Sequence, residues 1–168
     1  MPGDFRFVLV VAAVLVLLQP RRWSRVIPVV LTGPLVGLVY LFLKWCVGRH
    51  RPVIEIAPFA LHPFARGLHG LVGAEKGLSF PSGHAAMAFA AATCLAAIVR
   101  RGAAVFYLLA AGVAAERVLE NAHYPSDVVA GAGFGVCCGL LSLRIATRCF
   151  GPSRAVSPDG EKVSIPTR

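Results

Sequence analysis

Charged residues are scarce in this sequence. Asp, Glu, Lys and Arg make up 15% of its 168 residues, whereas soluble domains usually contain about 25%. Hydrophobic residues make up 57%, so the chain has too few polar side chains to cover the surface of a soluble domain. The composition therefore excludes an ordinary soluble protein and predicts an integral membrane protein, with the lipid bilayer as its surroundings.

Acidic residues are the rarest charged type, with eight Asp and Glu against 17 Lys and Arg and a net charge of +9. A basic balance can indicate a nucleic-acid partner, but the sequence lacks the basic face interleaved with aromatic residues that such binding uses. It also lacks the cysteine spacing of a metal site or a disulfide framework, because its five cysteines lie in or beside apolar segments. We expect no nucleic-acid partner, no metal and no other cofactor.

Five apolar segments divide the chain. A membrane-spanning helix needs about 20 predominantly apolar residues; four segments approach that length, and we interpret the shorter first one as a retained span because it lacks a signal-peptide cleavage site. The segments are residues 5–18, 26–43, 81–99, 103–119 and 128–145. The sequence thus predicts an all-α fold, a polytopic transmembrane helical bundle of about five spans, as one membrane domain over residues 1–150.

Two stretches outside the spans have their own composition. Residues 53–79 mix apolar side chains with His and Arg, a pattern suited to the headgroup layer, so we expect an interfacial loop between spans two and three. Residues 151–168 are polar and contain three prolines, which predicts a disordered cytoplasmic tail.

The distribution of Lys and Arg predicts the orientation in the membrane. If the spans alternate in direction, ten of the 17 basic residues fall on the side that includes the tail. Cytoplasmic loops have the excess of basic residues, so the opposite side, with the loop after the second span, faces outward. We expect an integral protein of a bacterial inner membrane with this outward face towards the periplasm or the exterior.

Small residues recur in the last span. Gly131, Gly135 and Gly139 lie four residues apart and would share one helix face, where another helix can approach closely. That helix could belong to the same chain or to a second copy, so the pattern leaves a homo-oligomer open.

Polar residues gather at the outward ends of the spans. Singly, each has an ordinary interpretation: a basic residue at a helix end reaches the headgroups, and a His–Asp pair can be interfacial. The alternating topology, however, places all of them at one membrane face, which predicts a functional site. The residues are Lys44, Arg51, Ser82, His84, Arg117, His123 and Asp127.

These residue types suit phosphoryl transfer. Fixed cations can stabilise the charge that spreads over the equatorial oxygens of the transferring group, and Arg offers paired donors to those oxygens. With Pro81 at the first helical position, the amides of Ser82, Gly83 and His84 would point out of a helix N-terminus, which binds anions. Gly83 would let a phosphate approach without a side chain in the way.

Two histidines can then divide the catalytic work. A neutral imidazole can attack phosphorus while a second His protonates the leaving alcohol. Asp127 follows His123 by four residues and can accept a hydrogen bond from one ring nitrogen, which leaves the other free to attack. His84 has no such carboxylate nearby in the sequence and is the better proton donor.

Three stretches, "KWCVGRHRP", "PSGH" and "RVLENAHYPSD", resemble the three signature motifs of the type 2 phosphatidic acid phosphatase superfamily, in the same order and with the same spacing over residues 44–127. The resemblance implies a helical membrane phosphatase that works without metal through a phosphohistidine intermediate. The site residues that it implies are the phosphate-binding Lys44, Arg51, Ser82, Gly83 and Arg117, the general acid His84, the nucleophile His123 and its orienting partner Asp127.

The sequence departs from the family pattern at two places. Glu116 stands where the third motif has a serine, and we expect it either to brace a basic residue such as Arg49 or Arg51, or to contact an amine on the substrate headgroup. Members of the family often have six spans, so with five the N-terminal edge would be open to lipid or covered by a second subunit.

The substrate that these features predict is a membrane lipid phosphate or diphosphate, hydrolysed at the extracytoplasmic face. Undecaprenyl diphosphate, phosphatidic acid, phosphatidylglycerol phosphate and lipid A phosphates all fit the pattern. Two alternatives from other classes are a catalytically silent scaffold or lipid-binding protein with the same fold, and a haloperoxidase that binds vanadate in a similar pocket.

Overall fold

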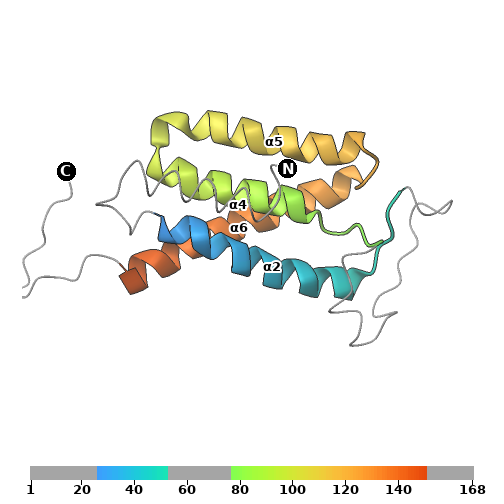
Figure 1. The fold of residues 1–168 in the computed structure, drawn as a ribbon, viewed down its shortest axis with the longest axis horizontal. Coiled ribbons are helices and arrows are strands. Elements are labelled where there is room, and N and C mark those ends of the chain that lie inside the picture. Colours follow the sequence, from blue (N-terminus) through green and yellow to red (C-terminus); the bar gives the residue numbers. More distant parts are fainter. Residues whose placement is uncertain (1–25, 53–76, 151–168) are drawn as a thin grey trace, which may run out of the picture.

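The computed structural model describes residues 26–52 and 77–150 (Figure 1). The predictions for the first span, for most of the interfacial loop and for the tail concern residues outside these ranges. The described residues form four α-helices and one 3-10 turn. They are α2 (Ile27–Val47), α4 (Gly83–Ile98), the turn η2 (Arg100–Gly102), α5 (Ala103–Leu119) and α6 (Pro125–Phe150).

Helix α4 lies at the centre of the bundle and packs against α2, α5 and α6 (Figure 1). The helices extend along the long axis of the molecule, with α5 beside α4. In the described part of the chain the only strand-like pairing is a single antiparallel bridge between His50 and Leu78. This arrangement confirms the predicted all-α helical bundle.

Three of the described helices are long and apolar enough to cross a membrane: Ile27–Val47, Arg100–Leu119 and Pro125–Cys149. They correspond to the second, fourth and fifth predicted spans. The predicted third span forms α4, which has 16 residues and is therefore about 24 Å long. It is shorter than residues 81–99 because Ser82 caps its first turn and the chain leaves helical geometry at Val99.

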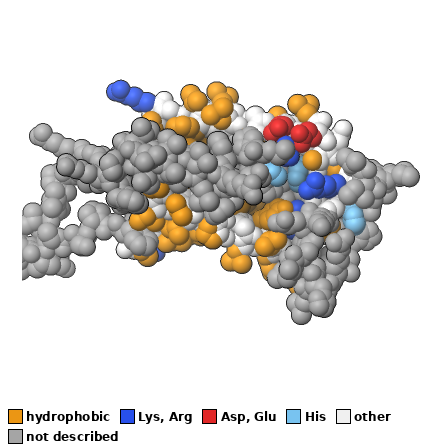
Figure 2. All heavy atoms as spheres, viewed as in Figure 1, with side chains coloured by type: hydrophobic (Ala, Val, Ile, Leu, Met, Phe, Trp, Pro, Cys, Tyr) orange, Lys and Arg blue, Asp and Glu red, His pale blue; other side chains and the backbone are white. Residues whose placement is uncertain are grey.

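Small side chains fill the interior of the bundle, and large apolar side chains cover its outside. Helix α4 buries mainly alanines, whereas Leu38 of α2 and Leu108 and Leu109 of α5 are 75%, 72% and 64% exposed. Soluble proteins rarely expose such a surface to water. Lipid tails are as apolar as leucine, so these exposed side chains are suited to contact with the bilayer. Figure 2 shows hydrophobic side chains along the described bundle and the acidic and histidine side chains towards one end.

The glycine stripe of α6 faces α4 of the same chain. A Cβ atom added at Gly131 would lie 2.5 Å from the carbonyl oxygen of Ser82, and one at Gly135 would overlap the carbonyl oxygen of Ala86. A Cβ atom at Gly139 would lie 2.8 Å from the carbonyl oxygen of Ala90. The stripe is therefore an intramolecular packing surface. A homo-oligomer stays a prediction that does not rest on it.

We expect Gly135→Ala to lower the melting temperature, because overpacking a tight interior typically costs about 1–3 kcal/mol. Gly133→Ala is the matched control on the same helix, since nothing lies within 4 Å of a Cβ atom at that position. Its melting temperature should equal that of the wild type or exceed it. Thermal unfolding in one detergent measures both variants, and equal losses would contradict the close approach of α4 and α6.

Candidate active site

Four helix ends meet at one end of the bundle: the C-termini of α2 and α5 and the N-termini of α4 and α6 (Figure 1). The backbone amide of Ser82 donates a 3.0 Å hydrogen bond to the carbonyl oxygen of Asp127, which ties the two N-termini together. The amide of His123 donates to the carbonyl oxygen of Arg117 over 3.2 Å. The polar residues predicted to share one membrane face therefore lie on elements that do converge.

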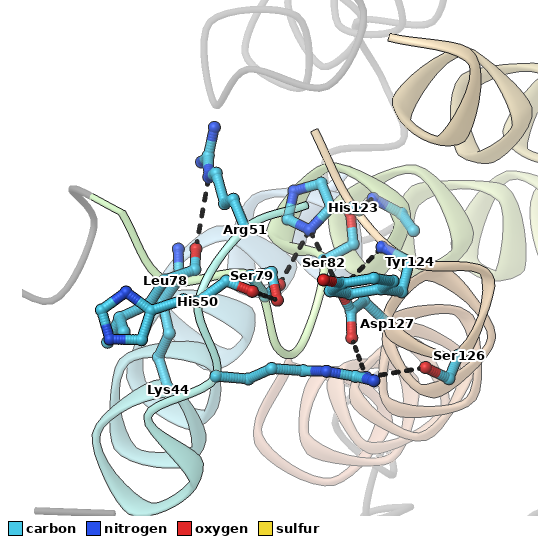
Figure 3. A network of polar contacts seen from close by, with 12 residues as sticks. Lys44, His50, Arg51, Leu78, Ser79, Ser82, His123, Tyr124, Ser126 and Asp127 are labelled. Atoms are coloured by element: carbon cyan, nitrogen blue, oxygen red, sulfur yellow. Dashed lines mark hydrogen bonds and ion pairs between the residues drawn. The ribbon is translucent and has the colours of Figure 1, made fainter. Parts of the chain in front are cut away.

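The loop after α2 pairs with the segment before α4. Helix α2 ends at Val47 and is capped by Gly48, whose φ of 61° lets the chain turn in the left-handed conformation that glycine tolerates. Beyond it, the amide of Ser79 donates to the carbonyl oxygen of Arg49 over 2.6 Å, and the amide of Arg51 donates to that of Gly77 over 3.1 Å. These bonds hold the first motif against the approach to the second. Figure 3 shows two side-chain contacts between the same segments, from Arg51 Nε to the carbonyl oxygen of Leu78 and from Ser79 Oγ to that of His50.

His123 is buried, with 4% of its surface exposed. Its Nδ1 atom lies 2.8 Å from the carbonyl oxygen of Ser79. Because a carbonyl oxygen can only accept, Nδ1 must hold the proton of the neutral ring, which leaves the lone pair on Nε2. The structure thus assigns the orienting hydrogen bond to Ser79, a residue that the sequence reasoning missed.

Asp127 is fully buried in the first turn of α6. Its Oδ2 atom accepts a 2.9 Å hydrogen bond from the amide of Tyr124 and lies 3.8 Å from Nδ1 of His123. The sequence predicted a direct hydrogen bond between Asp127 and His123. The structure shows a separation of 3.8 Å instead, too long for a hydrogen bond, because the Ser79 carbonyl occupies the hydrogen-bonding position of Nδ1.

The second oxygen of Asp127 has a partner that no motif position identified. Arg49 donates from Nη1 to Oδ1 over 2.8 Å. The negative charge is also placed favourably, since a carboxylate in the first turn of a helix interacts with the positive end of the helix dipole. A buried carboxylate in a membrane protein is costly without such partners.

Lys44 is completely buried near the end of α2. Its Nζ atom donates to the hydroxyl oxygen of Tyr40 and lies 4.5 Å from the centroid of that ring. The ring in turn lies against Gly83, where an added Cβ atom would be 2.7 Å from Cε2 of Tyr40. In this structure the missing side chain of Gly83 makes room for Tyr40, whereas the sequence reasoning assigned that room to a phosphate.

Ser82 occupies the N-cap of α4, and its Oγ atom accepts from the amide of Ala85 over 3.4 Å. Pro81 therefore precedes the cap and is not the first helical residue, which corrects the predicted start of this helix. His84 lies in the first turn and is half-buried. Since the amide of Ser82 already bonds Asp127, the predicted set of three outward-pointing amides does not form.

Two carboxylates contact Arg117. Glu116 belongs to the same helix, α5, and Glu120 is the residue directly after that helix. The Nη2 atom of Arg117 lies 2.9 Å from Oε2 of Glu120 and 3.4 Å from Oε2 of Glu116. Arg117 is 12% exposed, whereas Glu116 and Glu120 are 46% and 52% exposed. Glu116 therefore contacts a predicted phosphate-binding residue, but it is Arg117, its neighbour in the chain, and not Arg49 or Arg51.

No group of three or more His, Cys, Asp or Glu residues within ranges 26–52 and 77–150 is placed to hold a metal ion. The polar atoms of the site instead belong to cations, imidazoles and one buried carboxylate. Such a set can bind a phosphate through Lys and Arg, attack it with an oriented imidazole and supply a proton from a second one.

Known proteins resemble this chain in sequence and fold. The sequence model of the PAP2 superfamily matches residues 25–150. Lipid A 1-phosphatases of Rhizobium johnstonii and Rhizobium etli are each 35% identical over 126 residues, which is 74% of this chain but 48% and 51% of theirs. The chain thus spans about half the length of these curated relatives. The crystal structure of LpxE from Aquifex aeolicus is 30% identical with a TM-score of 0.63, over 84% of this chain and 79% of that one.

We expect the neutral ring of His123 to have its proton on Nδ1, because the Ser79 carbonyl accepts from that atom. Nitrogen NMR of histidine-labelled protein in detergent distinguishes the two tautomers. The variant His123→Gln identifies the resonances by their loss. A neutral ring protonated on Nε2 would contradict the orientation described above.

Proposed function

The chain belongs to the PAP2 superfamily, and from that premise we propose that it is an integral membrane phosphatase that releases phosphate from a lipid at the extracytoplasmic face of a bacterial inner membrane. The observation that carries the proposal is the orientation of His123. A buried imidazole with Nδ1 bonded to a backbone carbonyl has one nitrogen left for attack, and it lies at the end of the bundle where α2, the loop after it and α5 contribute cations.

In the proposed first step, Nε2 of His123 attacks phosphorus in line with the ester oxygen. The P–O bond to the lipid breaks, an N–P bond forms, and His84 gives its proton to the departing alkoxide. In the second step, His84 takes a proton from water, the water oxygen attacks phosphorus and the N–P bond breaks. Inorganic phosphate and the original state of both histidines result.

The cations would act on the phosphoryl oxygens in both steps. Lys44, Arg51 and Arg117 are the proposed phosphate-binding residues, and charge that develops on the equatorial oxygens is what fixed cations stabilise. Ser82 and Gly83 support the site through structure: Ser82 caps α4, and Gly83 makes room for the Tyr40 ring beside Lys44. Asp127 lies near enough to favour the imidazolium that forms when Nε2 bonds phosphorus.

Among the lipid substrates, we favour a phosphate of the lipid A type. Both curated relatives bear the name lipid A 1-phosphatase. The exposed apolar surface of the bundle would leave the acyl chains in the bilayer while the headgroup enters the polar end.

We expect detergent-purified protein to release phosphate from a lipid A phosphate faster than from undecaprenyl diphosphate, phosphatidic acid or phosphatidylglycerol phosphate. The release should continue in EDTA, because the proposed binding groups are Lys and Arg side chains. A malachite green assay across the four lipids measures both points. Activity that disappears in EDTA and returns with a divalent metal would overturn the mechanism.

The two histidines should fail in different ways. His123→Ala should abolish turnover on every substrate and form no acid-labile covalent phosphate. His84→Ala should lose about 10²–10⁴-fold on the lipid, the usual contribution of general acid catalysis, and much less on nitrophenyl phosphate, whose leaving group needs no proton. Steady-state rates on the two substrates measure the difference, and equal losses in both variants would contradict the division of roles.

A further inference from the structure

Arg49 lies between the two cations of the first motif and differs from both in its surroundings. Its side chain is 11% exposed. Its Nη1 atom donates 2.8 Å hydrogen bonds to Oδ1 of Asp127 and to Oγ of Ser126, and its guanidinium lies 4.3 Å from the centroid of the Tyr124 ring. Figure 3 shows Tyr124, Ser126 and Asp127 together at the start of α6. Every one of these contacts is therefore made to the segment that follows His123.

We propose that Arg49 is a positioning residue that holds Asp127 in the orientation in which it serves His123. This inference rests on the proposed function of the site. The carboxylate of Asp127 is held at both oxygens: Oδ1 by Arg49 over 2.8 Å and Oδ2 by the amide of Tyr124 over 2.9 Å. Two anchors on a planar group fix its rotation, and the oxygen that is left facing the imidazole is Oδ2.

The arrangement has a catalytic consequence. When Nε2 bonds phosphorus, the His123 ring becomes positively charged, and a carboxylate held at 3.8 Å can stabilise that charge without having to reorganise. Arg49 acts on the opposite oxygen, so it secures the carboxylate without standing between it and the ring. Without Arg49 the buried charge would lose its ion pair, and the carboxylate could turn towards another donor.

Arg49 is not placed as a phosphate ligand. Its Nη1 atom already donates to an anion and a hydroxyl, and one face of the guanidinium lies against an aromatic ring. Arg51, two residues on, donates from Nε to the carbonyl oxygen of Leu78 over 3.4 Å, its one side-chain hydrogen bond among residues 26–52 and 77–150. As Figure 3 shows, its side chain extends away from Asp127. The two arginines of one motif therefore have separate tasks: Arg51 for the substrate and Arg49 for the carboxylate behind the nucleophile.

The test compares Arg49→Gln and Arg49→Lys with Arg101→Gln, an exposed arginine at the far end of the bundle. Arg49→Gln should lower kcat by about 10–100-fold, by analogy with the loss when a partner that orients a metal ligand is removed, with KM nearly unchanged. The loss should be the same on lipid and on nitrophenyl phosphate, because attack by His123 precedes either product.

Arg49→Lys should recover part of the activity through its charge but not all, since an ammonium cannot reproduce the planar geometry of the guanidinium. Arg101→Gln should match the wild type.

A double-mutant cycle with Asp127→Asn separates positioning from a general effect on the fold. If Arg49 acts through Asp127, Arg49→Gln should cost little in the Asp127→Asn background. An equal cost in both backgrounds, or a raised KM at constant kcat, would overturn the proposal. Melting temperatures in the same detergent verify that each variant is folded.

A wild-type protein that releases phosphate from no substrate would refute the proposed function and not the role of Arg49. The nitrogen resonances of His123 then decide, because they report on the ring without turnover. Arg49→Gln should shift them and Arg101→Gln should not. Unshifted His123 resonances in folded Arg49→Gln would refute the positioning role.

Discussion

The backbone contact between α4 and α6 is the constraint on which the rest of the structure depends. Gly131, Gly135 and Gly139 let α6 lie directly against carbonyl oxygens of α4. The first of those carbonyls belongs to Ser82, whose amide also bonds the backbone of Asp127. The contacts of the glycine stripe begin at the polar end of the bundle. The packing that fills the interior therefore also places the N-termini of α4 and α6 side by side.

Three buried polar side chains at this end have partners within the protein, as a low-dielectric environment favours. The buried cation of Lys44 has the ring and hydroxyl of Tyr40, and the buried carboxylate of Asp127 has Arg49 and the amide of Tyr124. The imidazole of His123 has the carbonyl of Ser79. Each of these groups is bonded by a residue from another turn or another element, so contacts within the protein fix the three side chains in place.

The three arginines around this end differ in how much of their charge is already compensated. Arg49 faces the carboxylate of Asp127, and Arg117 faces Glu116 and Glu120, which are both half-exposed. Arg51 contacts a backbone carbonyl. Among the contacts of the described residues, Arg51 is thus the least compensated of these three charges, which is where the proposed function would place the phosphate. Glu116 and Glu120 present negative charge beside Arg117.

The sequence by itself determined the class of fold, the approximate places of the four described helices and the residues brought to one end. Apolar length and motif spacing are local properties, and alternating spans return their polar ends to the same face. Only the tertiary structure decided which helix meets the glycine stripe, and that Tyr40 fills the room beside Gly83. It also decided that His123 bonds Ser79, 44 residues away, and that Arg49 pairs with Asp127, 78 residues away. A backbone carbonyl has no sequence signature. In the sequence, an arginine between two motif cations resembles a third phosphate-binding residue, and only its contact with Asp127 indicates another role. Such contacts arise from how the helices pack, which no local pattern contains.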